Sequence, residues 1–546
     1  MNNSAPLSAA PLTGHPFGDR FAARLMDFSV RDIPWHRRLW SPGTVLALRE
    51  LTEAGPWVDA QVLSPAAMQW LCRDLERLAG DDLGIGGQEV RRHLRNALHA
   101  DLSEHSRHRR RLRDLVLLID ESYLARWAAA VDSGRGVSAE RLARTVAAHL
   151  LDSGYSMSFL DQVSRQHAKA GGTVGDLLQE AARLAAAQPG QFEVLVPFLA
   201  VPQRQELAEG LPEWRSGPQV REWLARHAPG DATRHNGAFA YQVQAMDPYA
   251  AADTARESVD RLLARSSLTR RNRSGLKPVG TLRVAGLNEW LPLETPSRGV
   301  YLLSLHKERT LYRIAGGDLL DSAIELAAPL NRGSRVAAVA GGWAALESLL
   351  HHPGDPADRK DGRVIAAVRL AAIVTGSWPR AELTALSYAH RPGTPDLLTR
   401  QLASVVSNRT RASTVAAALQ AGRQVSARTA GDAAAAARMA SLVAAPRQSL
   451  MGVRAAVEGS LRRLYRQRNI VLHGGSTESV ALDAALRTAA PLVGAGLDRV
   501  AHAYLADGIT PLALAATAET SLALASAQDA PLVTDLLERS VTRAAA

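Results

Sequence analysis

Alanine-rich segments, broken at intervals by proline and glycine, constrain the fold of this chain more than any other feature. Residues 433–437 are all alanine, and aromatic residues make up only 5% of the 546 positions. Alanine has the highest helix propensity, whereas strands favour β-branched and aromatic residues. The sequence therefore predicts a mainly α-helical protein. Its length exceeds what a single hydrophobic core holds, so we expect several domains.

The sequence patterns divide the chain into four segments. Residues 1–18 are rich in Ser, Pro, Ala and Gly, a composition typical of a disordered tail. Residues 19–232 predict an N-terminal helical domain, residues 235–310 a small α/β module, and residues 311–546 a second helical domain. No fixed-period repeat is visible, so a solenoid is not expected.

Local signals place the elements within these segments. Ser64 is a suitable N-cap and Pro65 a suitable first residue for a helix. Further N-terminal helices are expected at 138–151, 173–187 and 217–227. The module is expected to have strands at 237–245, 281–285 and 299–305, a helix from Asp247–Pro248 to 263, and a basic loop at 270–273. The C-terminal helices are expected at 317–330, 334–351, 361–374, 379–390, 410–423, 430–443, 447–473, 477–505, 510–525 and 531–544.

The net charge, the cysteine content and the absence of targeting signals limit the partners and the cellular location that we expect for this protein. The net charge of +10 permits binding to nucleic-acid phosphates, although an arginine-rich composition set by a GC-rich genome gives the same charge. Cys72 is the single cysteine, so an internal disulfide and a Cys-based zinc site are excluded. Residues 1–16 do not resemble a signal peptide, and no apolar run approaches the ~20 residues of a membrane span. We therefore expect a cytoplasmic protein without a membrane partner.

The segment at 464–475, Leu-Tyr-Arg-Gln-Arg-Asn-Ile-Val-Leu-His-Gly-Gly, is where chemistry is most visible. Arg468 falls on the apolar stripe of the predicted helix 447–473. A guanidinium that faces a core is costly unless it is paired or faces a polar pocket. Arg468 is therefore a candidate functional residue, and a structural arginine paired with a core acid such as Glu347 is the alternative. The stripe consists of Leu450, Val453, Val457, Leu461, Leu464 and Val471.

Helical phasing qualifies this site. Asn469 and His473 are four residues apart and share a face, but Arg468 and His473 are five apart, about 140° around an ideal helix. A site built from Arg468 and His473 is therefore expected to need a local bend or a second subunit. The alternative for His473 is a helix C-terminal residue favoured by the helix dipole.

Other candidate motifs are weaker. The spacing of His99, His105 and His108 superficially resembles a set of metal ligands, but the arginines at 109–111 oppose a cation. Arg95 and His99 are four residues apart, one fewer than Arg468 and His473. Phosphate-binding loops, nucleophile elbows and zinc-protease motifs are absent from the sequence. We therefore expect neither a metal site nor a cofactor.

The pattern Arg468-Asn469-x3-His473 resembles the Arg-x4-His motif of HEPN domains. The helix at 341–350, which contains Ala-Leu-Glu347, resembles the Leu-Glu-containing helix of Apea-like HEPN proteins. The resemblance covers about 311–505. It implies a helical bundle that dimerises or forms a larger homo-oligomer. It also implies a metal-independent endoribonuclease of the toxin or anti-phage type, including abortive-infection effectors.

The resemblance also implies roles for individual residues. His473 would act as general base or acid, Arg468 would stabilise charge on the phosphate, and Asn469 would orient His473 or a phosphate oxygen. Glu347 would position Arg468 or His473. The RNA product would carry a 2′,3′-cyclic phosphate. The basic side chains that would bind the RNA backbone are Arg462, Arg463 and Arg466.

Partners and alternatives follow from the same resemblance. RNA is the expected substrate, an antitoxin or a phage-derived trigger the expected regulator, and residues 19–310 the expected sensory or regulatory part. The first alternative is a catalytically silent HEPN-fold protein that dimerises and regulates by binding RNA or a protein. The second is a basic helical regulator that binds nucleic acid without cutting it.

Overall fold

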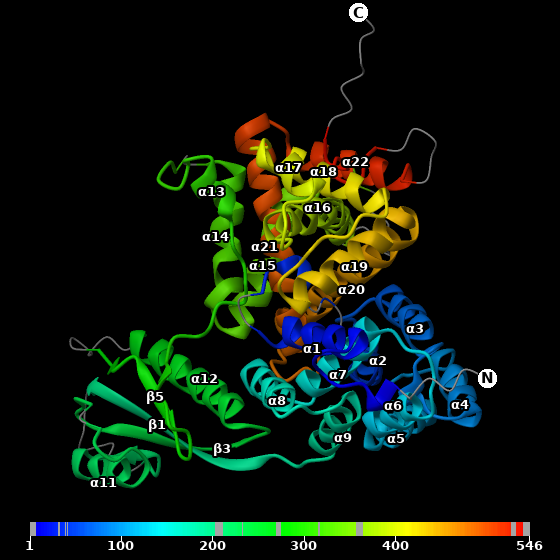
Figure 1. Cartoon of the computed structure of the whole chain (residues 1–546). Helices are drawn as coiled ribbons and strands as arrows, with labels where there is room; N and C mark the ends of the chain where they lie inside the picture. The colour runs from blue at the N-terminus through cyan, green and yellow to red at the C-terminus, as the bar shows by residue number, and fades with distance from the viewer. Residues whose placement is uncertain are drawn as a thin grey trace, which may run out of the picture. The chain divides into compact units, whose positions relative to one another are not determined.

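The computed structural model is mainly helical, as the composition predicts, and contains one small antiparallel sheet (Figure 1). The structure describes residues 7–30, 33–38, 40, 42–201, 211–231, 233–268, 275–314, 317–355, 364–525 and 531–538. Within these ranges, no helix has both the length and the apolarity that crossing a bilayer requires. The chain divides into two compact units, and each is described by itself.

The first unit contains residues 1–149, 164–182 and 298–546. Its N-terminal helices are α1 (Pro16–Ser29), α2 (Thr44–Asp59), α3 (Pro65–Ala79), α4 (Gln88–Leu98), α5 (Arg107–Glu121) and α6 (Tyr123–Asp132), with 3₁₀ helices η1 (Leu7–Ala9), η2 (Trp35–Arg37) and η3 (Leu83–Ile85). Its C-terminal helices are α13 (Leu303–Lys307), α14 (Leu319–Arg332), α15 (Arg335–Leu350), α16 (Ile365–Ala389), α17 (Leu397–Ala403), α18 (Asn408–Gln420), α19 (Ala430–Ala444), α20 (Pro446–Leu472), α21 (Leu482–Asp507) and α22 (Pro511–Ala523). Three of the four boundaries between the units fall within α7 (Ala139–Asp152), α8 (Met157–Lys169) and α9 (Val174–Ala185), and the fourth lies between residues 297 and 298.

The core of the first unit is formed mainly by α15, α16, α20, α21 and α22, which pack against one another. The N-terminal segment joins this core directly. The helix α1 packs on α19, and Arg37 donates from Nε to Glu382 of α16 at 2.8 Å. Ser460 of α20 donates to the carbonyl oxygen of Trp40. The predicted domain boundary at residue 311 therefore does not coincide with a boundary between the two units.

The second unit, residues 150–163 and 183–297, contains the sheet. The described strands are β1 (Gly190–Ala200), β2 (Trp214–Arg215), β3 (Ala238–Ala245), β4 (Lys277–Pro278), β5 (Thr281–Val284) and β6 (Leu291–Pro292), in the order β2-β3-β1-β5-β6 with β4 also paired to β1. Residues Val194, Val196 and Phe198 of β1 face the core that includes α12 (Pro248–Ser267), whereas Leu195 faces α11 (Gly217–His227). This alternation follows from the two-residue period of a strand.

Several predicted elements are wrong. Residues 299–302 form a loop and residues 303–305 begin α13, where a strand was predicted, and the central strand β1 lies in a region predicted to be helical. The helices predicted at 361–374 and 379–390 are a single helix, α16, which continues through the buried Pro379. The described part of the helix predicted at 531–544 has turns and no helix.

Two further predictions concern segments that the structure covers only in part. The predicted disordered tail, 1–18, contains η1 and the first turn of α1, and its first six residues lie outside the described residues. The basic loop predicted at 270–273 also lies outside them.

Candidate active site

The site predicted at 464–475 lies at the C-terminal end of α20. The helix ends at Leu472, and His473 is its C-cap, with φ −102° and a backbone N–H bond to Asn469 O of 2.9 Å. Gly474 lies against the Trp57 ring of α2, so closely that a Cβ at this position would be 2.8 Å from the ring. The end of α20 is therefore held by α2, an element far away in the sequence.

The side chains of Arg468 and His473 meet at this helix end. Arg468 Nη1 lies 2.9 Å from His473 Nε2 and donates a 3.0 Å hydrogen bond to Asn469 Oδ1. The half-buried guanidinium lies beside an exposed imidazole. The structure thus brings three of the four predicted site residues together within one chain.

This contact bears on the expectation, drawn from helical phasing, of a local bend or a second subunit. The 140° separation holds for a straight helix, but the φ of His473 departs by about 40° from a helical value. The long arginine side chain spans the remaining separation. A second subunit is therefore not needed to join Arg468 to His473.

The donor and acceptor roles in the contact follow from chemistry. A guanidinium has only N–H donors, so Nε2 of His473 accepts, and the neutral ring carries its proton on Nδ1. Among the described residues, Arg468 has no carboxylate partner, unlike its neighbours Arg463 and Arg466. The remaining donors of Arg468 are thus available to an anion.

Glu347 does not join this group. In the described residues, no hydrogen bond or ion pair links the Glu347 carboxylate to Arg468 or His473. The Trp343 ring of α15 contacts Tyr465 of α20 with ring centroids 4.8 Å apart, while Arg335, at the start of α15, lies 3.2 Å from Asp483 at the start of α21.

Asp483 lies at the start of the helix that follows α20, so the start of α15 lies toward the end of α20. The two helices therefore run antiparallel. Glu347 lies one turn after Trp343, and Arg468 lies three residues after Tyr465, so they diverge in opposite directions. At 1.5 Å per residue the separation along the axes is about 10 Å. The Ala-Leu-Glu347 pattern, on which the resemblance to Apea-like HEPN proteins rests, does not indicate how far Glu347 lies from Arg468 along the two helices.

The expectation that Arg462, Arg463 and Arg466 offer basic side chains to an RNA backbone is wrong for two of the three. Arg463 and Arg466 are each only 2% exposed and form ion pairs of 2.7 Å with Glu50 of α2, which is itself 3% exposed. Burial alone would raise the pKa of Glu50, but the two guanidinium groups outweigh burial and hold the pKa below its ordinary value. These two arginines therefore hold α20 against α2 and are not available to RNA.

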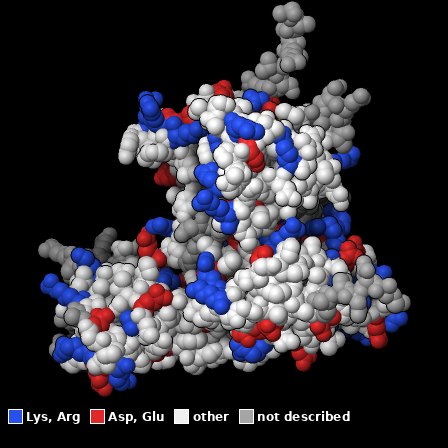
Figure 2. All heavy atoms as spheres, viewed as in Figure 1, with Lys and Arg blue, Asp and Glu red and all other residues white. Residues whose placement is uncertain are grey.

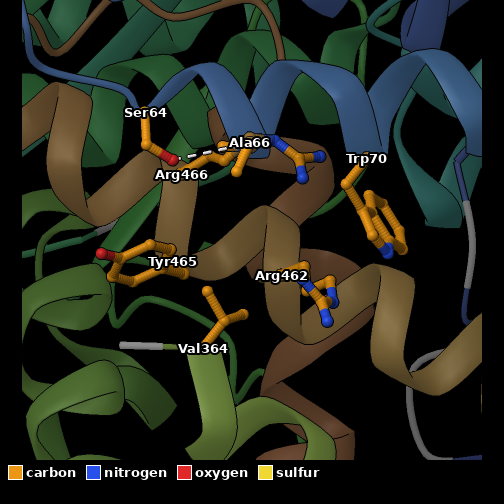
Figure 3. Close-up of a pocket in the computed structure, with 8 residues that line it drawn as sticks. Ser64, Ala66, Trp70, Val364, Arg462, Tyr465 and Arg466 are labelled. Carbon is orange, nitrogen blue, oxygen red and sulfur yellow. Dashed lines mark hydrogen bonds between the residues drawn. The ribbon is translucent and has the colours of Figure 1, made fainter. Parts of the chain in front are cut away.

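Arg462 is half-buried rather than free in solvent. Its Nε donates to Glu458 at 2.7 Å, and its guanidinium lies 5.2 Å from the ring centroid of Trp70 on α3. Figure 3 shows Arg462, Trp70 and Tyr465 around a cavity of about 20 Å³, which has room for one water molecule. This cavity is too small to hold a nucleotide.

Two residues important to this region were missed. Glu50 stands three residues after Ala47 and four before Ala54, both buried, so it is an acid on the apolar face of a helix. The same reasoning that singled out Arg468 could have found it. Gln467 is fully buried, and in the described residues its amide has no hydrogen-bond partner. No pattern in the sequence indicated this.

The weaker motifs do not form a metal site. In the part of the chain that the structure describes, no three His, Cys, Asp or Glu side chains are grouped so that they could hold a metal ion. His99 instead lies 2.9 Å from Glu76. In comparisons with family models, curated proteins and solved structures, nothing matches this chain.

Proposed function

We propose that this protein is a metal-independent endoribonuclease of the HEPN type that acts as a toxin-like or anti-phage effector. The observation that carries the proposal is the 2.9 Å contact between Arg468 and His473 at an exposed helix end. Arg468 is a cation without a carboxylate partner among the described residues, and His473 is a neutral base beside it. Cleavage of RNA beside a 2′-hydroxyl needs these two kinds of group.

In the proposed reaction, the phosphate of the bound RNA draws Arg468 away from the imidazole. The bidentate guanidinium then neutralises charge that develops on the phosphate oxygens. Release of Arg468 frees the Nε2 lone pair of His473, which takes the proton of the 2′-hydroxyl. The 2′-oxygen bonds to phosphorus, and the bond from phosphorus to the 5′-oxygen breaks. The products are a 2′,3′-cyclic phosphate and a 5′-hydroxyl that takes its proton from water or a second copy's imidazole.

The supporting residues have different parts in this proposal. Asn469 accepts from Arg468, so it orients the arginine rather than the histidine. Glu347 has no part, because it does not reach either group. In the proposed homodimer, a second His473 would lie near the first site.

One observation favours the form of the non-catalytic alternative in which a HEPN-fold regulatory protein binds a protein rather than RNA. Arg463 and Arg466 are buried, so the basic face expected to bind RNA is reduced. On the face shown in Figure 2, the Lys and Arg side chains are interspersed with acidic and uncharged ones. RNA binding therefore needs basic residues other than those predicted from the sequence.

The test compares wild type with His473→Ala and Arg468→Ala, in growth-arrest and RNA-cleavage assays with EDTA present. We expect both variants to lose cleavage by at least about 100-fold, the usual contribution of a general acid or base. Arg454→Ala removes a half-buried arginine from the same helix, and His105→Ala removes an exposed histidine elsewhere. Both controls should cleave like wild type.

The products separate the two candidate functions. Cleavage that leaves 2′,3′-cyclic phosphate ends and survives EDTA supports the nuclease. RNA that stays intact while still binding the wild-type protein supports the regulatory alternative. Equal activity of wild type, His473→Ala and Arg468→Ala would remove the proposed site.

A further inference from the structure

A groove runs along α3 and α4 of the first unit. Neither Arg468 nor His473 lines this groove. It consists of two hollows of about 370 and 550 Å³ that share Glu76, Leu98 and His99 as lining residues. The ion pair of 2.9 Å between His99 and Glu76 stands where they adjoin. Each hollow lies within the size range of small-molecule sites, about 300–1,000 Å³.

The floor of the groove is apolar. Leu94 and Leu98 of α4 are buried at 2% and 4% exposure and line the smaller hollow, and Met68 lines the larger one. Cys72, the single cysteine, is half-buried in the larger hollow. Burial, assisted by the Glu76 carboxylate, raises the pKa of this thiol to about 11. The surroundings of Cys72 are therefore poorly solvated.

The rim of the groove carries uncompensated positive charge. Arg73 lines the larger hollow and Arg95 the smaller one, both are exposed, and neither has a carboxylate partner among the described residues. Glu76 is the single carboxylate in either lining, and it is already paired with His99. The sequence offered Arg95 and His99 only as a near-match to the Arg-x4-His spacing.

We propose that this groove is a binding site for a small organic anion, with an apolar body on Leu98 and Met68 of the larger hollow and an acidic group at Arg73, while Arg95 adds positive charge from the smaller hollow. Two free guanidinium groups disfavour a cation. The apolar floor disfavours a bare inorganic ion, which would leave the floor exposed to water. The site is separate from the proposed nuclease site, and its test does not depend on RNA cleavage.

The unique cysteine makes the site directly observable. The probe is 8-anilinonaphthalene-1-sulfonate, and its neutral counterpart without the sulfonate is N-phenyl-1-naphthylamine. We expect the sulfonate to bind with one equivalent per chain and to slow alkylation of Cys72 by N-ethylmaleimide. The neutral compound should bind at least about tenfold more weakly, because charge-assisted hydrogen bonds are the stronger ones.

The double variant Arg73→Gln/Arg95→Gln should weaken sulfonate binding by at least about tenfold and remove the protection of Cys72. The matched control is Arg77→Gln, since Arg77 lies on α3, is paired with Asp74 and does not line the groove. Urea midpoints of both variants that equal the wild-type midpoint verify that the variants fold. Unprotected Cys72 at saturating probe would overturn the site, and equal affinities of the double variant and Arg77→Gln would overturn its preference for anions.

Discussion

At the scale of single residues, neighbouring arginines on α20 have opposite environments. Arg463 and Arg466 share the buried Glu50, whereas Arg468 contacts an amide and an imidazole. A buried charge without a partner is far more costly than a surface one. The two paired arginines thus stabilise the position of the helix end that presents Arg468.

Glu50→Ala should destabilise the first unit strongly, because it leaves two buried guanidinium groups without a counterion. We expect a loss of about 3–5 kcal/mol in the free energy of unfolding, measured by urea denaturation. The control is Glu89→Ala, whose side chain is 77% exposed and lies 3.9 Å from Arg92. The control should change stability by less than about 0.5 kcal/mol. Similar losses in both variants would contradict a structural role for Glu50.

Glu50 also predicts a pH dependence. Its pKa in the folded protein is lower than the ordinary value of 4.5. A depressed carboxyl pKa adds stability above the unfolded pKa, and this stability is lost as pH falls through the folded pKa. The stability difference between wild type and Glu50→Gln should be constant from pH 7 to about 5 and shrink below about 4.5. Urea midpoints across this range measure it, and a difference that grows on acidification would reverse the assigned sign.

At the scale of elements, the end of α20 depends on close packing with α2. Gly474 has no room for a side chain, since a Cβ would lie 2.6 Å from Ile470 O and 2.8 Å from the Trp57 ring. Gly452, on the same helix, has open space around it. The two glycines therefore separate packing effects from helix propensity.

Gly474→Ala should lower the free energy of unfolding by about 1–3 kcal/mol, because overpacking forces the neighbouring groups to shift. Gly452→Ala should raise it by about 0.5–1 kcal/mol, since alanine is the better helix residue. Thermal unfolding of both variants beside wild type measures the contrast. An unchanged free energy of unfolding in Gly474→Ala would mean that the Trp57 ring moves aside without loss of stability.

Sequence patterns identified the elements whose signals lie within the element itself and missed those that depend on packing against distant segments. The helix α20 was predicted at 447–473 and lies at Pro446–Leu472, because its apolar stripe and its two terminal glycines are local signals. The strand β1 was missed, since its core-facing Val194 and α11-facing Leu195 are both buried and the expected polar alternation is absent. The contact between Arg468 and His473 lies at the helix end, where the φ of His473 departs from a helical value, and spacing along an ideal helix does not give that departure.

At the scale of the whole molecule, residues 311–546 are not independent of the N-terminal segment. Trp40 belongs to the same core as Trp343 and Leu461, and Glu50 neutralises arginines of α20. The resemblance to a family domain suggested an autonomous C-terminal bundle. The packing instead predicts that the first unit folds from segments at both ends of the chain.

A fragment of residues 311–546 should therefore lack a cooperative thermal transition, whereas the full chain should show one. The fragment loses Glu50, Trp57 and Trp40 at once, so it exposes buried arginines and core surface. Near-ultraviolet circular dichroism reports the packing of its tryptophans. A sharp transition in the fragment, with native-like dichroism, would show that the C-terminal helices suffice.

The pairing of Glu50 with Arg463 also has a consequence for the order in which the nascent chain folds. The two residues are 413 positions apart. At about 5–20 residues per second, the ribosome needs about 20–80 s to pass from one to the other. During that interval Glu50 has been made and the arginines that neutralise it have not. The nascent N-terminal helices must therefore remain soluble with an open partner surface, and the helix end bearing His473 is fixed only when synthesis is nearly complete.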